Sequence, residues 1–268
     1  NKGMHMTLKR FGALKHVIPD RYVNYEIGRS IVEFDDFIKF LKEKLNEAQE
    51  INFKYSHQCS NTMAFQIIDT LANATIPNKV RYNRNRFIKY ITKFEIWENR
   101  ERVSLPHIKR LIELKPNVFD KKLCNWIDEE IFKWHNNKVY IEQDPLIKDI
   151  PKLWPIKIPK PFDNIKNLEY FQHKNLLYHF RNDLIHEFKI TRAFDPVDEK
   201  PYYHKIYSGS TENSKPYWHL FYPPGFMLNI AKDSISSVEK YYKEKKLKIK
   251  SSWGPFIFPN FNKNTYHV

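Results

Sequence analysis

Glycine is scarce in this chain, with only 6 glycines among 268 residues. This is roughly 2%, against about 7% in an average protein. Tight turns and phosphate-cradling loops need glycine, because it adopts positive φ without strain. The sequence therefore disfavours Rossmann-type folds, Gly-rich phosphate loops and β-barrels with many tight hairpins. Hydrophobic residues make up 41% of the chain, which is enough to build a substantial core and excludes global disorder.

Apolar residues instead recur at helical spacing along most of the chain. Between residues 30 and 50 they follow steps of three and four, from Ile31 to Leu45, which indicates an amphipathic helix. Ser30 and Glu33 match a capping box at its start. The predicted helices span 30–50, 57–75, 84–97, a short segment from Pro106 through Ile112, 119–135, 165–190 and 226–247. The fold class predicted is mainly α, a helical bundle.

Proline clusters in the segment 144–163, which neither a helix interior nor a central strand tolerates. We expect this segment to be an extended connector. It divides the chain into a helical N-terminal region, 1–143, and a C-terminal helical unit, 164–268. The sequence leaves open whether the N-terminal region is a separate domain or wraps the C-terminal unit.

An aromatic near-repeat predicts a β-hairpin at 201–222 within the C-terminal unit. The run PYYHKIY from Pro201 is echoed by PYWHLFY from Pro216, with turn-like polar residues between them. Aromatic and β-branched residues suit cross-strand pairing. The hairpin is interpreted either as a structural element that lies on the bundle or as a surface on which nucleobases stack.

The chain carries a formal net charge of +14. Such a charge exceeds the magnitude of about 2–8 that solubility requires, and it favours a polyanionic partner such as nucleic acid or an acidic membrane surface. The alternative is a compositional bias toward lysine. The segment RYNRNRF interleaves cations with aromatic and amide side chains, as an RNA-contacting segment does. We therefore expect Arg81, Arg84 and Arg86 to bind nucleic acid.

Two cysteines cannot form a disulfide framework, and no apolar run approaches the length of a membrane span. A cytoplasmic protein without membrane contact is expected. No Cys/His pattern has zinc spacing, so no cofactor or metal is predicted. His204 and His219 hold equivalent hairpin positions and could face each other, but two further ligands are missing nearby. His107 follows Pro106 and reads as a helix-start residue rather than a site histidine.

The most informative segment lies in the predicted helix 165–190. Five apolar residues form one stripe on this helix, namely Leu176, Leu177, Phe180, Leu184 and Phe188. Four polar residues at steps of four, three and four form a second stripe, namely Asn175, His179, Asn182 and His186. A stripe of amides and imidazoles differs from the lysines and glutamates of a merely solvated face.

Histidine, arginine and asparagine suit chemistry on a phosphodiester. An imidazole can deprotonate a hydroxyl or protonate a leaving oxygen near neutral pH. A guanidinium supplies positive charge for the transition state, and an amide can orient either group. This chemistry requires no metal.

The string Arg181-Asn182-Asp183-Leu184-Ile185-His186 resembles the R-[N/H/D]-x-x-x-H signature of the HEPN superfamily (higher eukaryotes and prokaryotes nucleotide-binding domain). The resemblance covers about residues 165–247, with the hairpin as an insertion. It implies an all-α core of about four helices and a homodimer in which the motif helices face each other. Many such proteins are metal-independent endoribonucleases, often toxins or antiviral-defence effectors.

By this resemblance, Arg181 and His186 are catalytic and Asn182 supports them, with His179 and Asp183 as further supporting candidates. The ribose 2′-OH attacks its own phosphate and leaves a cyclic phosphate, so DNA is spared. The sequence leaves open whether a partner protein neutralises the activity.

Two other interpretations compete with a ribonuclease. The chain is a non-catalytic nucleic-acid-binding or regulatory module, or it is a helical protein whose charge reflects composition alone. For the two motif residues, the alternative to a functional role is that Arg181 is a surface residue that pairs locally with Asp183 or Glu187, and that His186 is a packed or capping histidine.

Overall fold

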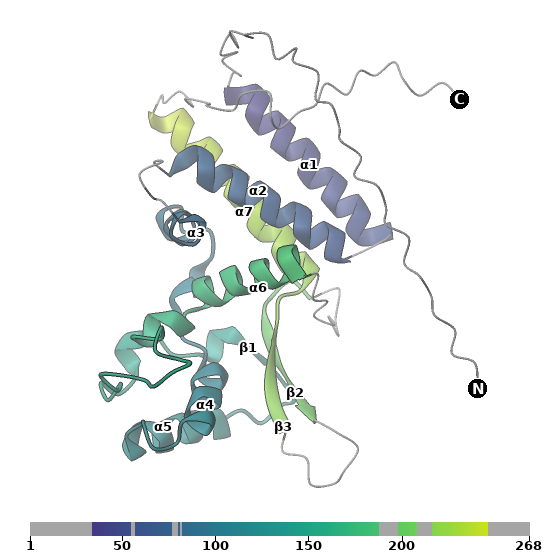
Figure 1. Ribbon diagram of the computed structural model, residues 1–268. Helices are drawn as coiled ribbons and strands as arrows, with labels where there is room; N and C mark the ends of the chain where they lie inside the picture. The colour runs from purple at the N-terminus through teal and green to yellow at the C-terminus, as the bar shows by residue number, and fades with distance from the viewer. Residues whose placement is uncertain are drawn as a thin grey trace, which may run out of the picture. The chain divides into compact units, whose positions relative to one another are not determined.

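Long amphipathic helices and a small antiparallel sheet make up the structure (Figure 1). The computed structural model describes residues 34–54, 57–76, 80, 82–187, 198–207 and 216–245. These ranges are mainly helical and include the predicted hairpin, which confirms the predicted fold class. All of them belong to one compact unit, Val32–Lys250.

The helices form close to where the apolar spacing predicts them. They are α1 Phe34–Lys54, α2 His57–Thr75, α3 Asn83–Lys93, α4 Leu105–Leu114, α5 Lys121–Phe132, α6 His173–Glu187 and α7 Pro224–Lys245. α3 ends four residues before its predicted end, because the chain turns at Glu95, which has a φ of 49°. Ser30 and Glu33, the predicted capping box, lie outside the described residues.

α1, α2 and α7 pack against one another (Figure 1). In α1 the buried residues Ile38, Leu41 and Leu45 follow steps of three and four, which places them on one face of the helix. In α7 Val238 and Tyr242 are buried four residues apart. Helices from both sides of the Pro-rich segment therefore contribute to one hydrophobic core.

Between residues 144 and 163 the Pro-rich segment contains no α-helix or strand, only one 3₁₀ turn, Ile147–Asp149, and an isolated β-bridge from Leu146 to Arg102. Ile150 and Ile158 are buried. Trp154 packs edge-on against Phe119 and Phe171. The segment is irregular and is packed on the core, and its predicted role as a connector between two parts of the chain stays a prediction.

The sheet has the strand order β1-β2-β3 and is antiparallel throughout. The hairpin strands are β2 Tyr202–Tyr207 and β3 Pro216–Phe221, and β1 Lys138–Tyr140 joins the outer side of β2. β1 was not predicted from the sequence, because three residues are too few to display an alternating pattern. On the hairpin, His204 and His219 lie directly opposite each other, as the near-repeat suggests.

α6 begins eight residues later than predicted, at His173. Leu168–Phe171 forms a 3₁₀ turn, and Gln172 is extended, with a φ of −64° and a ψ of 144°. Gln172 forms an isolated β-bridge with Val103, and its side-chain amide donates to the Glu101 backbone oxygen. These contacts with a distant segment fix the residue before α6 in a non-helical conformation.

The start of α6 is held by the buried carboxylate of Asp144. His173 Nε2 lies 2.8 Å from Asp144 Oδ2, and both side chains are fully buried. The Tyr203 hydroxyl of β2 donates to the same oxygen at 2.6 Å. The Leu105 backbone N–H, at the start of α4, donates to Asp144 Oδ1 at 3.2 Å. One carboxylate thus accepts hydrogen bonds from α4, α6 and the sheet.

Two more side chains extend this network. Ser104 Oγ lies 2.7 Å from the Tyr203 hydroxyl and 2.6 Å from His107 Nδ1. Each hydroxyl has one proton to donate. All of these hydrogen bonds form when Tyr203 donates to Asp144, Ser104 donates to Tyr203 and His107 Nδ1 donates to Ser104. Burial lowers the pKa of His107 to about 4, so His107 is neutral near pH 7. The prediction that His107 is a helix-start residue agrees with its place in the first turn of α4.

The substitution Asp144→Asn tests whether this carboxylate holds the fold together. The amide can replace only part of the acceptor, so buried donors lose their partner, and the expected loss of unfolding free energy is about 3 kcal/mol. Urea unfolding followed by circular dichroism measures it. The control Asp163→Asn changes an exposed side chain and is expected to cost less than about 0.5 kcal/mol. Equal stability of the two variants would contradict this account.

Candidate functional site

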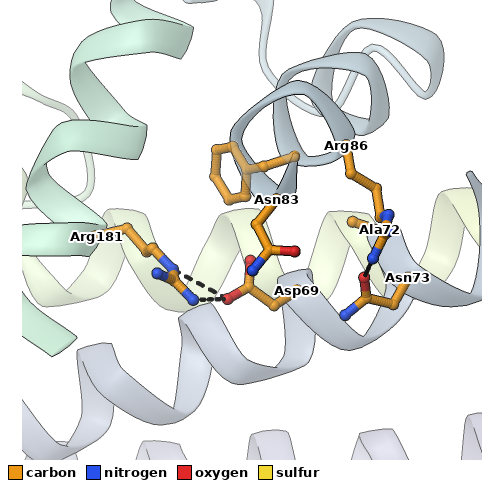
Figure 2. Close-up of a pocket in the computed structure, with 7 residues that line it drawn as sticks. Asp69, Ala72, Asn73, Asn83, Arg86 and Arg181 are labelled. Carbon is orange, nitrogen blue, oxygen red and sulfur yellow. Dashed lines mark hydrogen bonds and ion pairs between the residues drawn. The ribbon is translucent and has the colours of Figure 1, made fainter. Parts of the chain in front are cut away.

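Arg181 lies where α6 contacts α2 and α3. α2 contributes Asp69 and Asn73, which are four residues apart and so share a face of that helix. α3 contributes Asn83 and Arg86 from its first turns. Together with Ala72 and Phe87, these side chains line a small pocket (Figure 2).

The pocket is small, with a cavity volume of about 60 Å³. This is far below the range of about 300–1,000 Å³ that is typical of small-molecule sites. In Figure 2, Asn83 lies between Arg181 and Arg86 above α2. The pocket thus joins the motif arginine with an arginine of the segment predicted to bind nucleic acid.

Arg181 forms an ion pair with Asp69. Its Nε and Nη2 donate to Asp69 Oδ2 at 3.0 and 2.6 Å (Figure 2). The side chains are 13% and 24% exposed, respectively. Burial raises the pKa of Asp69, and the neighbouring guanidinium opposes that rise. From the sequence, only Asp183 and Glu187 were expected as acidic partners of Arg181, and Asp69 was not.

Asn182 acts on the same arginine. Its Oδ1 accepts a hydrogen bond from Arg181 Nη1 at 2.9 Å. The Arg181 guanidinium also lies 5.8 Å from the ring centroid of Tyr178. Asn182 therefore helps to orient Arg181, and its predicted supporting role in catalysis stays a prediction.

Arg86 is anchored on the other side of the pocket. Its Nη1 donates to Asn73 Oδ1, and its Nη2 donates to the Val80 backbone oxygen at 3.1 Å. Its Nε is buried and has no hydrogen-bond partner among the described residues. Two hydrogen bonds thus hold the Arg86 side chain at the pocket, and both of these partners are neutral.

Arg84 belongs to a second, separate cluster on α6. Its Nη2 donates to Asn175 Oδ1 at 2.7 Å, and Asn175 Nδ2 donates to the Glu169 backbone oxygen. His179 lies in the same region, with its ring 5.3 Å from that of Tyr170. Burial, together with the charge of Arg84, lowers the pKa of His179. Arg84 and His179 do not line the pocket that holds Arg181.

The remaining predicted site residues are less defined. Asp183 is exposed on α6. For His186 the structure describes only its place in α6, five residues after Arg181, and nothing of its side chain. Arg81 lies outside the described residues. Their predicted roles stay predictions.

Asp69 and Asn73 are the polar pocket residues that sequence reasoning missed, whereas Asn83 belongs to the segment RYNRNRF, which was predicted to contact RNA. A signal for Asp69 was present, since it is the only Asp, Glu, Lys or Arg among residues 57–75. A lone charge in a largely buried helix usually has a partner. Its partner could not be named from sequence, because Arg181 is 112 residues away.

Other site types find little support in the described ranges. No group of three or more His, Cys, Asp or Glu side chains there could hold a metal ion. The facing pair His204 and His219 has no further ligand within such a group. Among the same residues, no helix combines the length and the apolar character needed to cross a membrane.

The substitution Arg181→Gln tests the ion pair. It leaves the Asp69 carboxylate poorly solvated, and we expect a loss of about 2 kcal/mol of unfolding free energy at pH 7. Without Arg181, the pKa of Asp69 in the folded state rises further above its unfolded value, so protonation favours the folded variant. The deficit should therefore shrink between pH 7 and about pH 5.

Urea unfolding at the two pH values measures this change. The control Arg110→Gln alters a side chain that is 70% exposed, and it should change stability little at either pH. A deficit for Arg181→Gln that stays constant or grows as the pH falls would refute the proposed coupling to Asp69.

No protein-family model matches the chain, and neither a curated protein nor a solved structure matches it significantly. The resemblance of Arg181 through His186 to the HEPN signature therefore stays a prediction.

Proposed function

We propose that this protein is a metal-independent endoribonuclease that binds a phosphate group of RNA in the pocket between α2, α3 and α6. One observation carries the proposal: Arg181 of the motif and Arg86 of the basic segment line the same pocket, although 95 positions separate them in the sequence. Two guanidinium groups around a small pocket suit a phosphate, which they bind through charge-assisted hydrogen bonds.

The charge and size of the pocket support a phosphate over a nucleobase. Arg86, Arg181 and Asp69 together leave one positive charge in excess on the lining. Apart from Phe87 and Ala72, the lining side chains are polar or charged, whereas a base needs an aromatic or apolar surface on which to stack. The net charge of +14 attracts RNA from a distance in a salt-dependent way.

In the proposed reaction, the ribose 2′-oxygen attacks the adjacent phosphorus, and the bond from phosphorus to the 5′-oxygen breaks. His186 takes the proton of the 2′-OH, and the leaving 5′-oxygen receives a proton from water or from the His186 of a second protomer. Arg181 stabilises the extra negative charge on the phosphate oxygens in the transition state. The products are a 2′,3′-cyclic phosphate and a 5′-OH end.

The proposal includes a homodimer and a cytoplasmic location, and a role in defence or as a toxin follows from the sequence resemblance alone.

A second function, nucleic-acid binding without cleavage, has its own support. Asp69 already neutralises Arg181, which suits a module that binds nucleic acid without cleaving it. Both functions use the same basic pocket, so only an activity assay separates them.

The variant His186→Ala separates them most directly. With EDTA present, we expect wild-type protein to cleave single-stranded RNA and to leave cyclic phosphate ends, and to spare DNA of the same sequence. His186→Ala should bind RNA as wild type does but cleave at least about 100-fold more slowly, the usual contribution of a general base. The control His135→Ala changes an exposed histidine outside α6 and should cleave normally.

Each outcome decides between the two functions. Cleavage by wild type and His135→Ala, but not by His186→Ala, supports the ribonuclease. Salt-dependent binding without cleavage by any of the three proteins overturns it in favour of the binding module. Absence of both binding and cleavage in wild type overturns both functions.

A further inference from the structure

The ion pair between Arg181 and Asp69 uses only one oxygen of the carboxylate. Arg181 Nε and Nη2 both donate to Asp69 Oδ2. In the strongest form of such a pair, two parallel hydrogen bonds join two nitrogens to two oxygens. The second oxygen of Asp69 takes no part in this pair, so the contact is weaker than a full fork-to-fork pair.

The surroundings of Asp69 also disfavour the charged form of its carboxyl group. The carboxylate lies on α2 among residues that are mostly buried, and burial raises its pKa despite the guanidinium nearby. A carboxylate in such a place is poorly solvated and depends on Arg181 for its charge. It lies on the pocket lining, where a ligand that enters would meet the same guanidinium.

The opposite side of the pocket offers a second cation, Arg86, which has no acidic partner among the described residues. Arg86 is held by an amide oxygen and a backbone carbonyl, both neutral, so its charge is not cancelled locally. Its Nε is buried without a partner among the described residues. Asn83, between the arginines in Figure 2, adds an exposed amide that can donate to an anion.

We propose that one backbone phosphate of RNA enters this pocket between Arg86 and Arg181 and displaces the carboxylate of Asp69 from Arg181. Asp69 is then a built-in counter-ion that competes with the phosphate and lowers the affinity of the free protein for RNA. This inference rests on the proposed function, because it takes RNA as the ligand. It adds how the site binds that ligand and what restrains it.

The substitution Asp69→Asn tests the competition. Asparagine keeps the shape of the side chain but removes its charge, so phosphate no longer competes with a carboxylate at position 69 for Arg181. In the variant, phosphate no longer has to break the ion pair in order to reach Arg181. Since a partly solvated ion pair is weak, we expect RNA to bind about fivefold more tightly. The probe is a single-stranded RNA with methylated 2′-hydroxyls, which cannot be cleaved by 2′-OH attack. Fluorescence anisotropy at several salt concentrations gives the affinities.

Two further variants control the experiment. Asp69→Ala removes the same charge with a different side chain, and thermal unfolding of each variant verifies that it is folded. Asp128→Asn makes the same change in net charge at a site on α5 that is 60% exposed and paired with Lys109. It should change the affinity less than twofold, because it lies outside the pocket lining and salt screens its charge.

Tighter binding by both folded Asp69 variants, but not by Asp128→Asn, supports the inference. Unchanged or weaker binding by the Asp69 variants overturns it, since Asp69 then serves only to position Arg181. An equal gain for Asp128→Asn also overturns it, because the effect is then one of overall charge. If wild type and all variants fail to bind the RNA, the proposed function itself fails and the inference falls with it.

Discussion

The buried carboxylate of Asp144 is the contact on which the described structure depends most. It accepts hydrogen bonds from Leu105, His173 and Tyr203, which lie at the start of α4, at the start of α6 and in β2. An unpaired buried carboxylate is costly, so the chain must bring these three segments together or lose stability. Because His173 is the first residue of α6, the network also fixes where that helix begins, and α6 carries Arg181.

Arg181 is in turn placed by its own ion pair, with Asp69 of α2. α2 packs on α1 and α7, so the pocket rests on the main helical layer of the protein. Arg86 reaches the same pocket from α3. Two cations, a poorly solvated carboxylate and amide side chains form a site that suits a single phosphate group, whether or not a reaction follows.

Local pattern explains what could be predicted from the sequence. The apolar spacing gave the helices and the aromatic near-repeat gave the hairpin, because both patterns arise within short stretches of chain. The start of α6 could not be predicted, since contacts of Gln172 with Glu101 and Val103 decide it. Asp69 was missed for the same reason, because only the fold brings it to an arginine 112 residues away.

The most direct test of the shared phosphate site is a double-mutant cycle on RNA binding. The affinities of wild type, Arg86→Gln, Arg181→Gln and the double variant for the uncleavable RNA give the coupling between the two arginines. If both contact one phosphate, the losses are not additive, and the coupling is at least about 1 kcal/mol. Losses that add within about 0.5 kcal/mol would show that the arginines act independently, which would contradict a single phosphate site.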